Sequence, residues 1–324
     1  MKKVALVTGV VGQDGAYLSK LLLEKDYKVY GLVRRYTNPT FHNLDYLGIT
    51  SDVDLISGDM TDEGSLMHVI KSIRPHEIYN LAAQSFVGAS WEQAKYTSEV
   101  DAMGVLYILN AMKHFAPTAK FYQASTSEMF GNSHDNGIQT ETTPFKPRSP
   151  YAIAKLYAHW MTINFRESYS LFTCSGILFN HESPIRGKEF VTRKITDGIA
   201  RIQAGLDTHI KLGNTDSSRD WGFAGDFVEA MYLMLQQDEP DDFTIATGET
   251  HTIAEFLDIA FKEIEIDDWS NFVTLDPQFK RPAELFKLKG NPQKAKEKLS
   301  WVPKTSFEDL VKMMVRADLE RYGV

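Results

Sequence analysis

The chain has 324 residues, 43% of them hydrophobic, which is enough to fill the core of one large domain or two modest ones. Its formal net charge of −8 at pH 7 argues against general binding to nucleic acid or to an anionic membrane, although a local basic pocket for a phosphate group remains possible. A single cysteine, Cys174, excludes an internal disulfide and a cysteine-rich metal site, and is typical of a reducing cytoplasm.

The hydrophobic runs of the chain are short. Residues 1–7 superficially resemble a signal peptide, but Thr8 and Gly9 end the apolar run and no small-residue cleavage site follows. No run reaches transmembrane length. We therefore expect a soluble cytoplasmic protein in which Cys174 packs within a strand.

A strand, a glycine turn and a helix follow one another at the N-terminus. Residues 4–7 are apolar, as expected of a parallel strand buried on both faces. Gly9, Gly12 and Gly15 then form a G-x-x-G-x-x-G turn, and a helix over about 13–25 would direct its free amides at an anion held over the turn. Such a turn at the first strand–helix junction favours a site for a dinucleotide pyrophosphate.

Charged residues follow the next two strands. Arg34 and Arg35 come after the strand expected over 28–33, where an NAD-preferring protein usually has an acid. An arginine there favours the 2′-phosphate of NADP; the alternative is two solvated surface charges. Asp59 follows the strand expected over 53–56, and either accepts a hydrogen bond from the adenine amine or caps the next helix.

Small and polar residues follow the fourth and fifth strands. The stretch 78–85 begins as a strand and ends in small residues that let a cofactor approach closely, and a long helix over about 96–115 leads to a strand over 121–124. Residues 125–128, Ser-Thr-Ser-Glu, either cap a turn or form a proton-handling set, because ligands bind at this edge of an open α/β sheet.

Ser149 and Pro150 predict the start of the next helix, since serine is a good N-cap and proline suits the first helical position. Tyr151 and Lys155 then lie four residues apart on one face. A neighbouring ammonium favours the phenolate, so we expect Tyr151 to act as a base or proton relay near neutral pH. The alternative is an ordinary surface pair.

The repeated strand–helix units predict an α/β fold with a doubly wound parallel Rossmann sheet. We place an NADP-binding Rossmann domain at residues 1–180 and a smaller mixed α/β substrate domain at 181–324, and expect about 223–247 to return to the first domain. The elements expected in the C-terminal half are helices over about 191–204, 223–236, 253–264 and 307–322 and strands over 210–212 and 244–246.

Three basic residues of the C-terminal half, Lys194, Arg219 and Arg281, suit an anionic substrate. The alternative for each is a surface charge paired with a neighbouring acid. His181 lies beside Glu182, but no second histidine follows at ligand spacing, so we expect no metal site.

Together these stretches resemble the extended short-chain dehydrogenase/reductase family, and within it the GDP-mannose 4,6-dehydratases, over nearly the whole chain. The glycine turn and Tyr151-x-x-x-Lys155 are shared by the superfamily. The more specific motifs are GQDG at 12–15, NLAAQS at 80–85, YQASTSE at 122–128, PRSPY at 147–151, NHESP at 180–184, FVTRK at 190–194, LGN at 212–214, RDWG at 219–222 and RPAE at 281–284.

The resemblance implies that GDP-mannose is the substrate and that NADP is used and regenerated within one turnover. It implies that Tyr151, helped by Lys155, removes the proton of the sugar 4-hydroxyl as hydride leaves C4. Glu128 would then take the C5 proton, and water would leave C6 with Thr126 and Glu128 assisting. Hydride would return to C6, giving GDP-4-keto-6-deoxymannose.

The resemblance also implies binding residues and an oligomer. The cofactor-binding residues would be Gly9, Gly12, Gln13, Asp14, Gly15, Arg35, Asp59, Met60, Leu81, Ala82, Ala83, Gln84, Ser85, Tyr96, Ser125, Tyr151, Lys155, His181 and Arg186. The substrate-binding residues would be Ser85, Thr126, Ser127, Glu128, Tyr151, Asn180, Val191, Lys194, Leu212, Gly213, Arg219, Arg281 and Glu284. Members of the family form dimers or tetramers, and in the tetramers the loop at about 35–43 reaches a neighbour's cofactor.

The chain departs from the family pattern at Val11, Ile185 and Phe286, where threonine, arginine or leucine, and aspartate are usual. The rival functions are a dehydratase acting on a GDP-heptose, or a nucleotide-sugar epimerase or reductase. Glu128 argues against the last two, because neither needs a base for C5. A non-catalytic NADP-sensing protein would have no reason to combine Thr126 and Glu128 with the Tyr–Lys pair.

Overall fold

A parallel seven-stranded sheet lies at the centre of the computed structural model, which describes residues 2–35, 40–132, 137–276 and 287–324. The strand order is β11–β6–β5–β4–β1–β2–β3. The strands are β1 (Val4–Thr8), β2 (Lys28–Val33), β3 (Asp54–Ser57), β4 (Glu77–Asn80), β5 (Lys120–Thr126), β6 (Phe172–Leu178) and β11 (Phe243–Ile245). The direction of winding reverses between β1 and β4, and this switch point leaves a crevice at their carboxyl ends.

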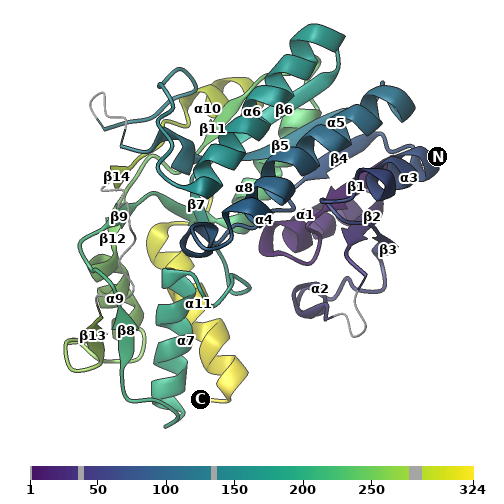
Figure 1. Ribbon diagram of the computed structural model, residues 1–324. Coiled ribbons are helices and arrows are strands. Elements are labelled where there is room, and N and C mark those ends of the chain that lie inside the picture. Colours follow the sequence, from purple (N-terminus) through teal and green to yellow (C-terminus); the bar gives the residue numbers. More distant parts are fainter. Residues whose placement is uncertain (1, 36–39, 133–136, 277–286) are drawn as a thin grey trace.

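Helices cover both faces of the sheet (Figure 1). On one face pack α1 (Gln13–Glu24), α8 (Ala224–Leu235) and α10 (Gln293–Leu299); on the other pack α3 (Glu63–Ile73), α5 (Gly104–Phe115) and α6 (Pro150–Tyr169). Strand β1 shows why both faces are apolar: Ala5 and Val7 join the first core and Leu6 joins the second. The continuous apolar run therefore predicted a strand covered on both sides, as observed.

Short helical segments shape the ligand edge of the sheet. They are α2 (His42–Tyr46), η1 (Val87–Ser90), α4 (Ala94–Ser98), η2 (Glu99–Met103) and η3 (Ser127–Phe130). Segments α4, η2 and α5 follow one another directly, and η2 is a π-helical turn. The long helix expected over about 96–115 is therefore confirmed as one helical stretch, in which the hydrogen bonding changes at η2.

A smaller lobe contains the rest of the C-terminal half. Helices α7 (Val191–Gln203), α9 (Ile253–Lys262) and α11 (Phe307–Tyr322) share a hydrophobic core. Three small sheets accompany them: β7 (Asn180–Glu182) with β10 (Trp221–Phe223), β8 (Ile210–Leu212) with β13 (Val273–Leu275), and β9 (Ser218–Arg219) between β12 (His251–Thr252) and β14 (Lys287–Leu288).

Three segments of the C-terminal half, α8, β11 and α10, lie with the large sheet rather than with the smaller lobe. Strand β11 pairs with β6, and α8 packs against α1. In Figure 1 the smaller lobe, with α7, α9 and α11, lies below and to the left of the sheet, so the carboxyl edge of the sheet faces it. The expected α/β class with a doubly wound parallel sheet is confirmed.

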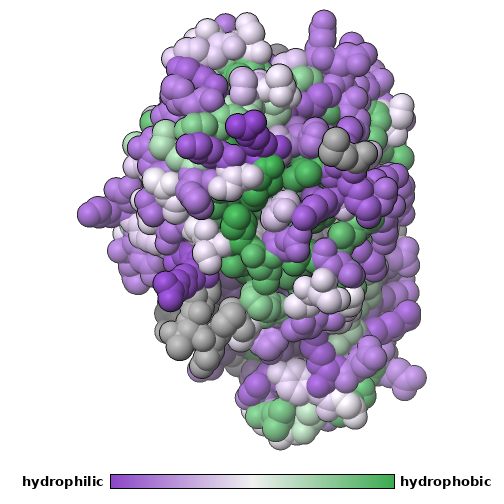
Figure 2. Space-filling model, turned by 90° about the vertical axis from the view of Figure 1, so that its right-hand side faces the viewer, coloured by the Kyte–Doolittle hydropathy of each residue, from purple (hydrophilic) through white to green (hydrophobic). Residues whose placement is uncertain are grey.

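The surface is mixed in character. Figure 2 shows the face at the right of Figure 1, where hydrophilic side chains cover most of the surface and a band of hydrophobic side chains crosses its middle. Among the described residues, no helix has the length and hydropathy that a membrane crossing requires.

Candidate active site

The glycine turn after β1 is built for a close backbone approach. Gly9 has φ +67°, and a Cβ on it would lie 2.8 Å from the amide nitrogen of Ala82. A Cβ on Gly15 would lie 2.2 Å from the carbonyl oxygen of Gly9. The turn is therefore open only to glycine at these positions, and it brings the first amides of α1 to the crevice.

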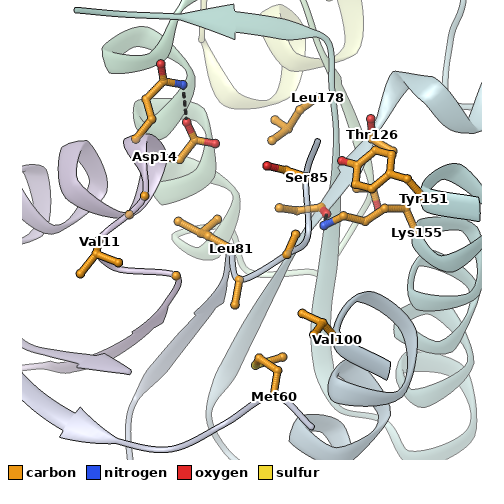
Figure 3. Close-up of a pocket in the computed structure, with 18 of the residues that line it drawn as sticks. Val11, Asp14, Met60, Leu81, Ser85, Val100, Thr126, Tyr151, Lys155 and Leu178 are labelled. Atoms are coloured by element: carbon orange, nitrogen blue, oxygen red, sulfur yellow. Dashed lines mark hydrogen bonds between the residues drawn. The ribbon is translucent and has the colours of Figure 1, made fainter. Parts of the chain in front are cut away.

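A cavity of about 590 Å³ occupies this crevice and extends over the ends of β1, β4, β5 and β6. Figure 3 shows Val11 and Asp14 on one side of it, Thr126, Tyr151 and Lys155 on the other, and Leu81 between them. The glycine turn and the Tyr–Lys pair, 142 residues apart from Gly9 to Tyr151, thus line one cavity. Most of the predicted site residues that the structure describes line it as well.

The predicted residues that line the cavity are Gly9, Gly12, Gln13, Asp14, Gly15, Asp59, Met60, Leu81, Ala82, Ala83, Ser85, Tyr96, Ser125, Thr126, Ser127, Glu128, Tyr151, Lys155, Asn180, His181 and Arg186.

Tyr151 and Lys155 are both buried in the first turns of α6. The helix begins as expected, because the Ser149 side chain accepts a hydrogen bond from the Ala152 amide, with 3.1 Å between Oγ and N. Lys155 Nζ donates to the Ala124 carbonyl oxygen at 2.9 Å and lies 5.9 Å from the centre of the Tyr151 ring. The alternative of an exposed surface pair is therefore wrong, since the two residues are 8% and 3% exposed.

The expected direction of the Tyr151 pKa is also wrong for this structure. Burial raises its pKa well above the usual value for tyrosine, the charges of Asp101 and Glu128 act in the same direction, and a hydrogen bond with Thr126 opposes them. Burial lowers the pKa of Lys155, against the charges of Asp101 and Asp14. Removal from water therefore favours the neutral forms of Tyr151 and Lys155 more strongly than the attraction between their charged forms favours ionisation.

The residues after β5 stand beside Tyr151. Thr126 is the N-cap of η3, where its Oγ1 accepts from the Glu128 amide at 3.3 Å. Figure 3 shows Thr126 next to the Tyr151 ring. Ser125 Oγ lies 3.1 Å from His159 Nδ1 on α6. The capping interpretation of residues 125–128 is therefore confirmed. Their hydroxyl and carboxyl groups also line the cavity, and a proton-handling role for them stays a prediction.

A buried ion pair joins α1 to β7. His181 Nδ1 lies 2.7 Å from the Phe179 carbonyl oxygen and Nε2 lies 2.8 Å from Asp14 Oδ2. Both ring nitrogens therefore face acceptors, which requires the doubly protonated imidazolium. Burial alone would lower the pKa of His181 and raise that of Asp14, but their mutual attraction reverses both: the His181 pKa is raised and the Asp14 pKa falls to about 2.

Gln13 extends this network. Its Nε2 donates to the His181 carbonyl oxygen at 3.1 Å, and its Oε1 accepts from Ser183 Oγ at 2.8 Å. Gln13 and the buried pair thus tie the first turn of α1 to the start of the smaller lobe.

Arg34 stands at the far end of the cavity. It lines the cavity and donates to the Tyr96 hydroxyl, with 2.9 Å between Nη1 and Oη. Both Arg34 and Arg35 are exposed, but Arg35 lies outside the lining. Asp59 does not cap α3; that role belongs to Asp62, whose Oδ1 accepts from the Gly64 amide at 3.0 Å. Asp59 instead accepts two bonds from Thr61 and lines the cavity. The capping interpretation of Asp59 is wrong because the helix starts three residues later than that interpretation requires.

Several predicted residues lie elsewhere. Gln84 is absent from the lining, although Ala83 and Ser85 on either side are part of it. The described substrate candidates outside the lining are Val191, Lys194, Leu212, Gly213 and Arg219, which belong to the smaller lobe. Arg281, Glu284 and Phe286 lie outside the described residues.

Sequence reasoning missed part of the lining. Its apolar members include Leu32, Val87, Val100, Leu178 and Phe190. Most of these are core-like residues with no polar signal in the sequence. Phe190 could have been found only as the first residue of the FVTRK motif at 190–194. In the structure the Arg186 guanidinium lies 3.6 Å from the centre of the Phe190 ring.

Comparison with known proteins identifies the family. The family model described as GDP-mannose 4,6 dehydratase matches residues 6–314. The chain belongs to the GDP-mannose 4,6-dehydratase family. GDP-mannose 4,6 dehydratase 1 of Arabidopsis thaliana is 51% identical, over 98% of this chain and 90% of the relative. The GDP-mannose 4,6 dehydratase of Homo sapiens is 47% identical, over 98% of this chain and 92% of the relative.

Solved structures share the fold of this GDP-mannose 4,6-dehydratase family member. The UDP-glucose 4-epimerase of Thermotoga maritima with UDP-glucose matches with a TM-score of 0.86 at 25% identity, over 98% of this chain and 99% of that one. The dTDP-glucose 4,6-dehydratase DesIV of Streptomyces venezuelae, with NAD and TYD bound, matches with a TM-score of 0.86 at 24% identity, over 99% and 98%. The predicted family resemblance is thus confirmed.

Proposed function

We propose that this protein converts GDP-D-mannose to GDP-4-keto-6-deoxy-D-mannose and water, with NADP bound along the cavity. The observation that carries the proposal is the presence of Thr126, Glu128, Tyr151 and Lys155 in the same cavity as the glycine turn. Membership of the family and relatives named GDP-mannose 4,6-dehydratase support the reaction.

The described residues fit a dinucleotide. Gly9, Gly12 and Gly15 leave room for a pyrophosphate beside the amides of α1, and Arg34 offers a cation at the end of β2. A solved neighbour from Pseudomonas aeruginosa is a complex with NADPH, and DesIV is one with NAD. When bound, the nicotinamide accepts a hydride from C4 of the sugar and later returns it to C6.

The chain's own groups would move the protons. Tyr151 takes the proton of the 4-hydroxyl, and the Lys155 charge and Thr126 hydroxyl stabilise the phenolate. The 4-keto group acidifies the C5 proton, which the half-buried Glu128 carboxylate removes. The C6 hydroxyl would leave as water with the proton that Glu128 took from C5. After hydride reaches C6, C5 would take a proton from solvent, and Tyr151 would release the proton of the 4-hydroxyl to solvent. The carbon skeleton loses one water and the cofactor ends in its starting redox state.

The smaller lobe would bind the GDP part of the substrate. We propose residues 1–180, with about 223–247, as the cofactor domain and residues 181–324 as the GDP-sugar domain. The pairing of β11 with β6 supports the return of the second segment. Lys194, Arg219, Arg281 and Glu284 remain proposed contacts of the nucleotide.

A homo-oligomer and a cytoplasmic location are also proposed. Of the four large apolar side chains that stand exposed on α6, three lie around one cavity, namely Ile153 at 58%, Tyr157 at 38% and Trp160 at 54%. They flank a second cavity, and a second copy of the chain would remove them from water. The single buried cysteine fits a reducing compartment.

The reaction is tested with purified protein, GDP-mannose and a trace of NADP in deuterated water. The expected product has lost one water relative to GDP-mannose and carries one solvent deuteron at C5. It should form without net production of NADPH. Net accumulation of NADPH, or no turnover of GDP-mannose, would reject the proposal. Parallel assays with a GDP-heptose test whether the protein is instead a dehydratase of that sugar. A product that keeps its C6 hydroxyl and has the inverted configuration at C4 would indicate an epimerase.

A further inference from the structure

Asp101 is a buried carboxyl group to which the reaction above assigns no role. It lies in the π turn η2, which packs against α6, and is 1% exposed. Its Oδ1 accepts a hydrogen bond from the Gln84 amide at 2.7 Å, while Oδ2 is buried without a hydrogen-bond partner among the described residues. An ionised carboxylate is costly in such a place unless an opposite charge lies near it.

Lys155 supplies that opposite charge. It lies on the helix that packs against η2, is 3% exposed, and uses one of its three donors on the Ala124 carbonyl oxygen. Figure 3 shows Lys155 reaching into the pocket above Val100, the residue that precedes Asp101. Asp101 therefore approaches the Tyr–Lys pair from the side of η2, behind the cavity wall.

We propose that Asp101 is a positioning residue of this active site: its carboxylate keeps the Lys155 ammonium charged, and its bond to Gln84 holds the loop after β4 at the cavity edge. Asp101 lies in the π-helical turn at 99–103, where the helix is wound differently from the α-helical segments on either side. The kinetic part of the proposal rests on the proposed function, whereas the electrostatic part does not.

The titrations of these groups are linked. Burial raises the pKa of Asp101 to about 7, against the Lys155 charge and the Gln84 amide. The Asp101 charge raises the pKa of Lys155 and of Tyr151. The other charged groups acting on the pair are Asp14 from α1, Glu128 from η3 and Arg186 from the loop after β7. Loss of the Asp101 charge therefore lowers the pKa of both Tyr151 and Lys155. On our proposal the loss of the Lys155 ammonium at alkaline pH outweighs the easier ionisation of Tyr151, because the ammonium is the cation that stabilises the phenolate.

The kinetic test is Asp101→Asn, which keeps an oxygen for the Gln84 amide and removes the charge. Because asparagine resembles the protonated carboxyl group, kcat should stay within about 3-fold of wild type at pH 6 and fall at least about 10-fold at pH 9. KM for GDP-mannose should change little. Glu99→Gln, an equivalent change in the same π turn, is the matched control and should keep the wild-type profile.

A substrate-free test uses the reciprocal change, Lys155→Met. The carboxyl carbons of labelled aspartates are followed by NMR against pH, and the Asp101 signal is assigned by its loss in Asp101→Asn. Without the ammonium, the Asp101 pKa should rise by about one pH unit or more. An unchanged Asp101 titration, or an equal loss of kcat in Asp101→Asn at all pH values, would overturn the proposal even if the wild-type enzyme dehydrates GDP-mannose.

Discussion

The Tyr151 phenol is held in its neutral form by the protein itself. The sequence places Lys155 one turn away, which favours the phenolate, but the structure removes both groups from water. The effect of desolvation on the Tyr151 pKa then exceeds the attraction of Lys155, because burial also disfavours the charged form of that lysine. Tyr151 needs a further cation to act as a base, and an oxidised nicotinamide ring bound in this cavity carries a positive charge.

Glu128 separates dehydration from simple oxidation at the residue scale. We expect Glu128→Gln to lower kcat for dehydration by about 100-fold or more, since general acid–base catalysis contributes roughly 10²–10⁴-fold. Exchange of the C5 proton with solvent, followed by NMR, should fall in parallel, and NADP affinity should stay near wild type. A collapse of NADP binding would instead assign Glu128 a structural role.

The Asp14–His181 pair makes stability depend on pH. The His181 pKa is raised above 6.5, so its contribution is complete below that pH and is lost as the pH rises through the folded value. The Asp14 pKa is lowered from 3.8 to about 2, so its contribution is present above 3.8 and is lost as the pH falls toward 2. The pair should therefore stabilise the fold most between pH 3.8 and 6.5.

We expect Asp14→Asn to lower the free energy of unfolding by roughly 1 to 3 kcal/mol at pH 5, and by less at pH 9. Urea unfolding at the two pH values measures the difference. Glu24→Gln, an exposed change on the same helix, is the control and should have no pH-dependent effect. An equal loss at pH 5 and pH 9 would show that the charges are not responsible.

At the scale of elements, the turn between β1 and α1 combines a backbone constraint with a binding role. Thr8 Oγ1 accepts from the amides of Leu81 and Ala82, each at 3.1 Å, which fixes the end of β1 against the end of β4. The glycines then fit between these two strand ends. The same packing that shapes the cavity therefore also limits the residues allowed in the turn.

Gly15→Ala tests this limit. Its Cβ would meet the Gly9 carbonyl oxygen at 2.2 Å, so the turn must shift and NADP affinity should fall by about 10-fold or more, with a lower melting temperature. Calorimetric titration with NADP and thermal unfolding measure the two effects. Gly64→Ala, whose Cβ meets only the end of the Asp62 side chain at 3.3 Å, should bind NADP as wild type does. Undiminished affinity in Gly15→Ala would contradict a pyrophosphate site at this turn.

At the scale of the whole molecule, charged and apolar contacts connect the parts of the chain. Asp318 of α11 is fully buried and pairs with Arg193 of α7, with 2.7 Å between Oδ1 and Nη2. Arg321 also pairs with Asp318 and donates to the Pro184 carbonyl oxygen at 2.6 Å. The C-terminal helix is thereby fixed to α7 and to the loop that contains Arg186 at the cavity.

The exposed face of α6 predicts the assembly. A charge at its centre, in Trp160→Glu, should convert the proposed homo-oligomer to a smaller species, because an unpaired charge is costly within an apolar interface. Light scattering coupled to gel filtration gives the mass. Leu206→Glu, a similar change at a 57% exposed residue of the smaller lobe, is the control. A wild-type monomer, or an unchanged mass in Trp160→Glu, would place no interface on α6.

The sequence by itself determined the sheet, the glycine turn and the start of α6. These depend on local signals, namely apolar runs, glycines without a Cβ, and the Ser149–Pro150 cap, which act over a few residues. It also determined the family, because its motifs are spread over the chain.

Only the tertiary structure decided which charges meet. The charges of Asp101 and Lys155 influence each other from two different helical segments, and Asp14 meets His181 across 167 residues of chain. Burial of Tyr151 reverses the expected direction of its pKa, and the fold places Arg34 rather than Arg35 beside the cavity. Desolvation and charge pairing depend on neighbours distant in the sequence, which no local pattern records.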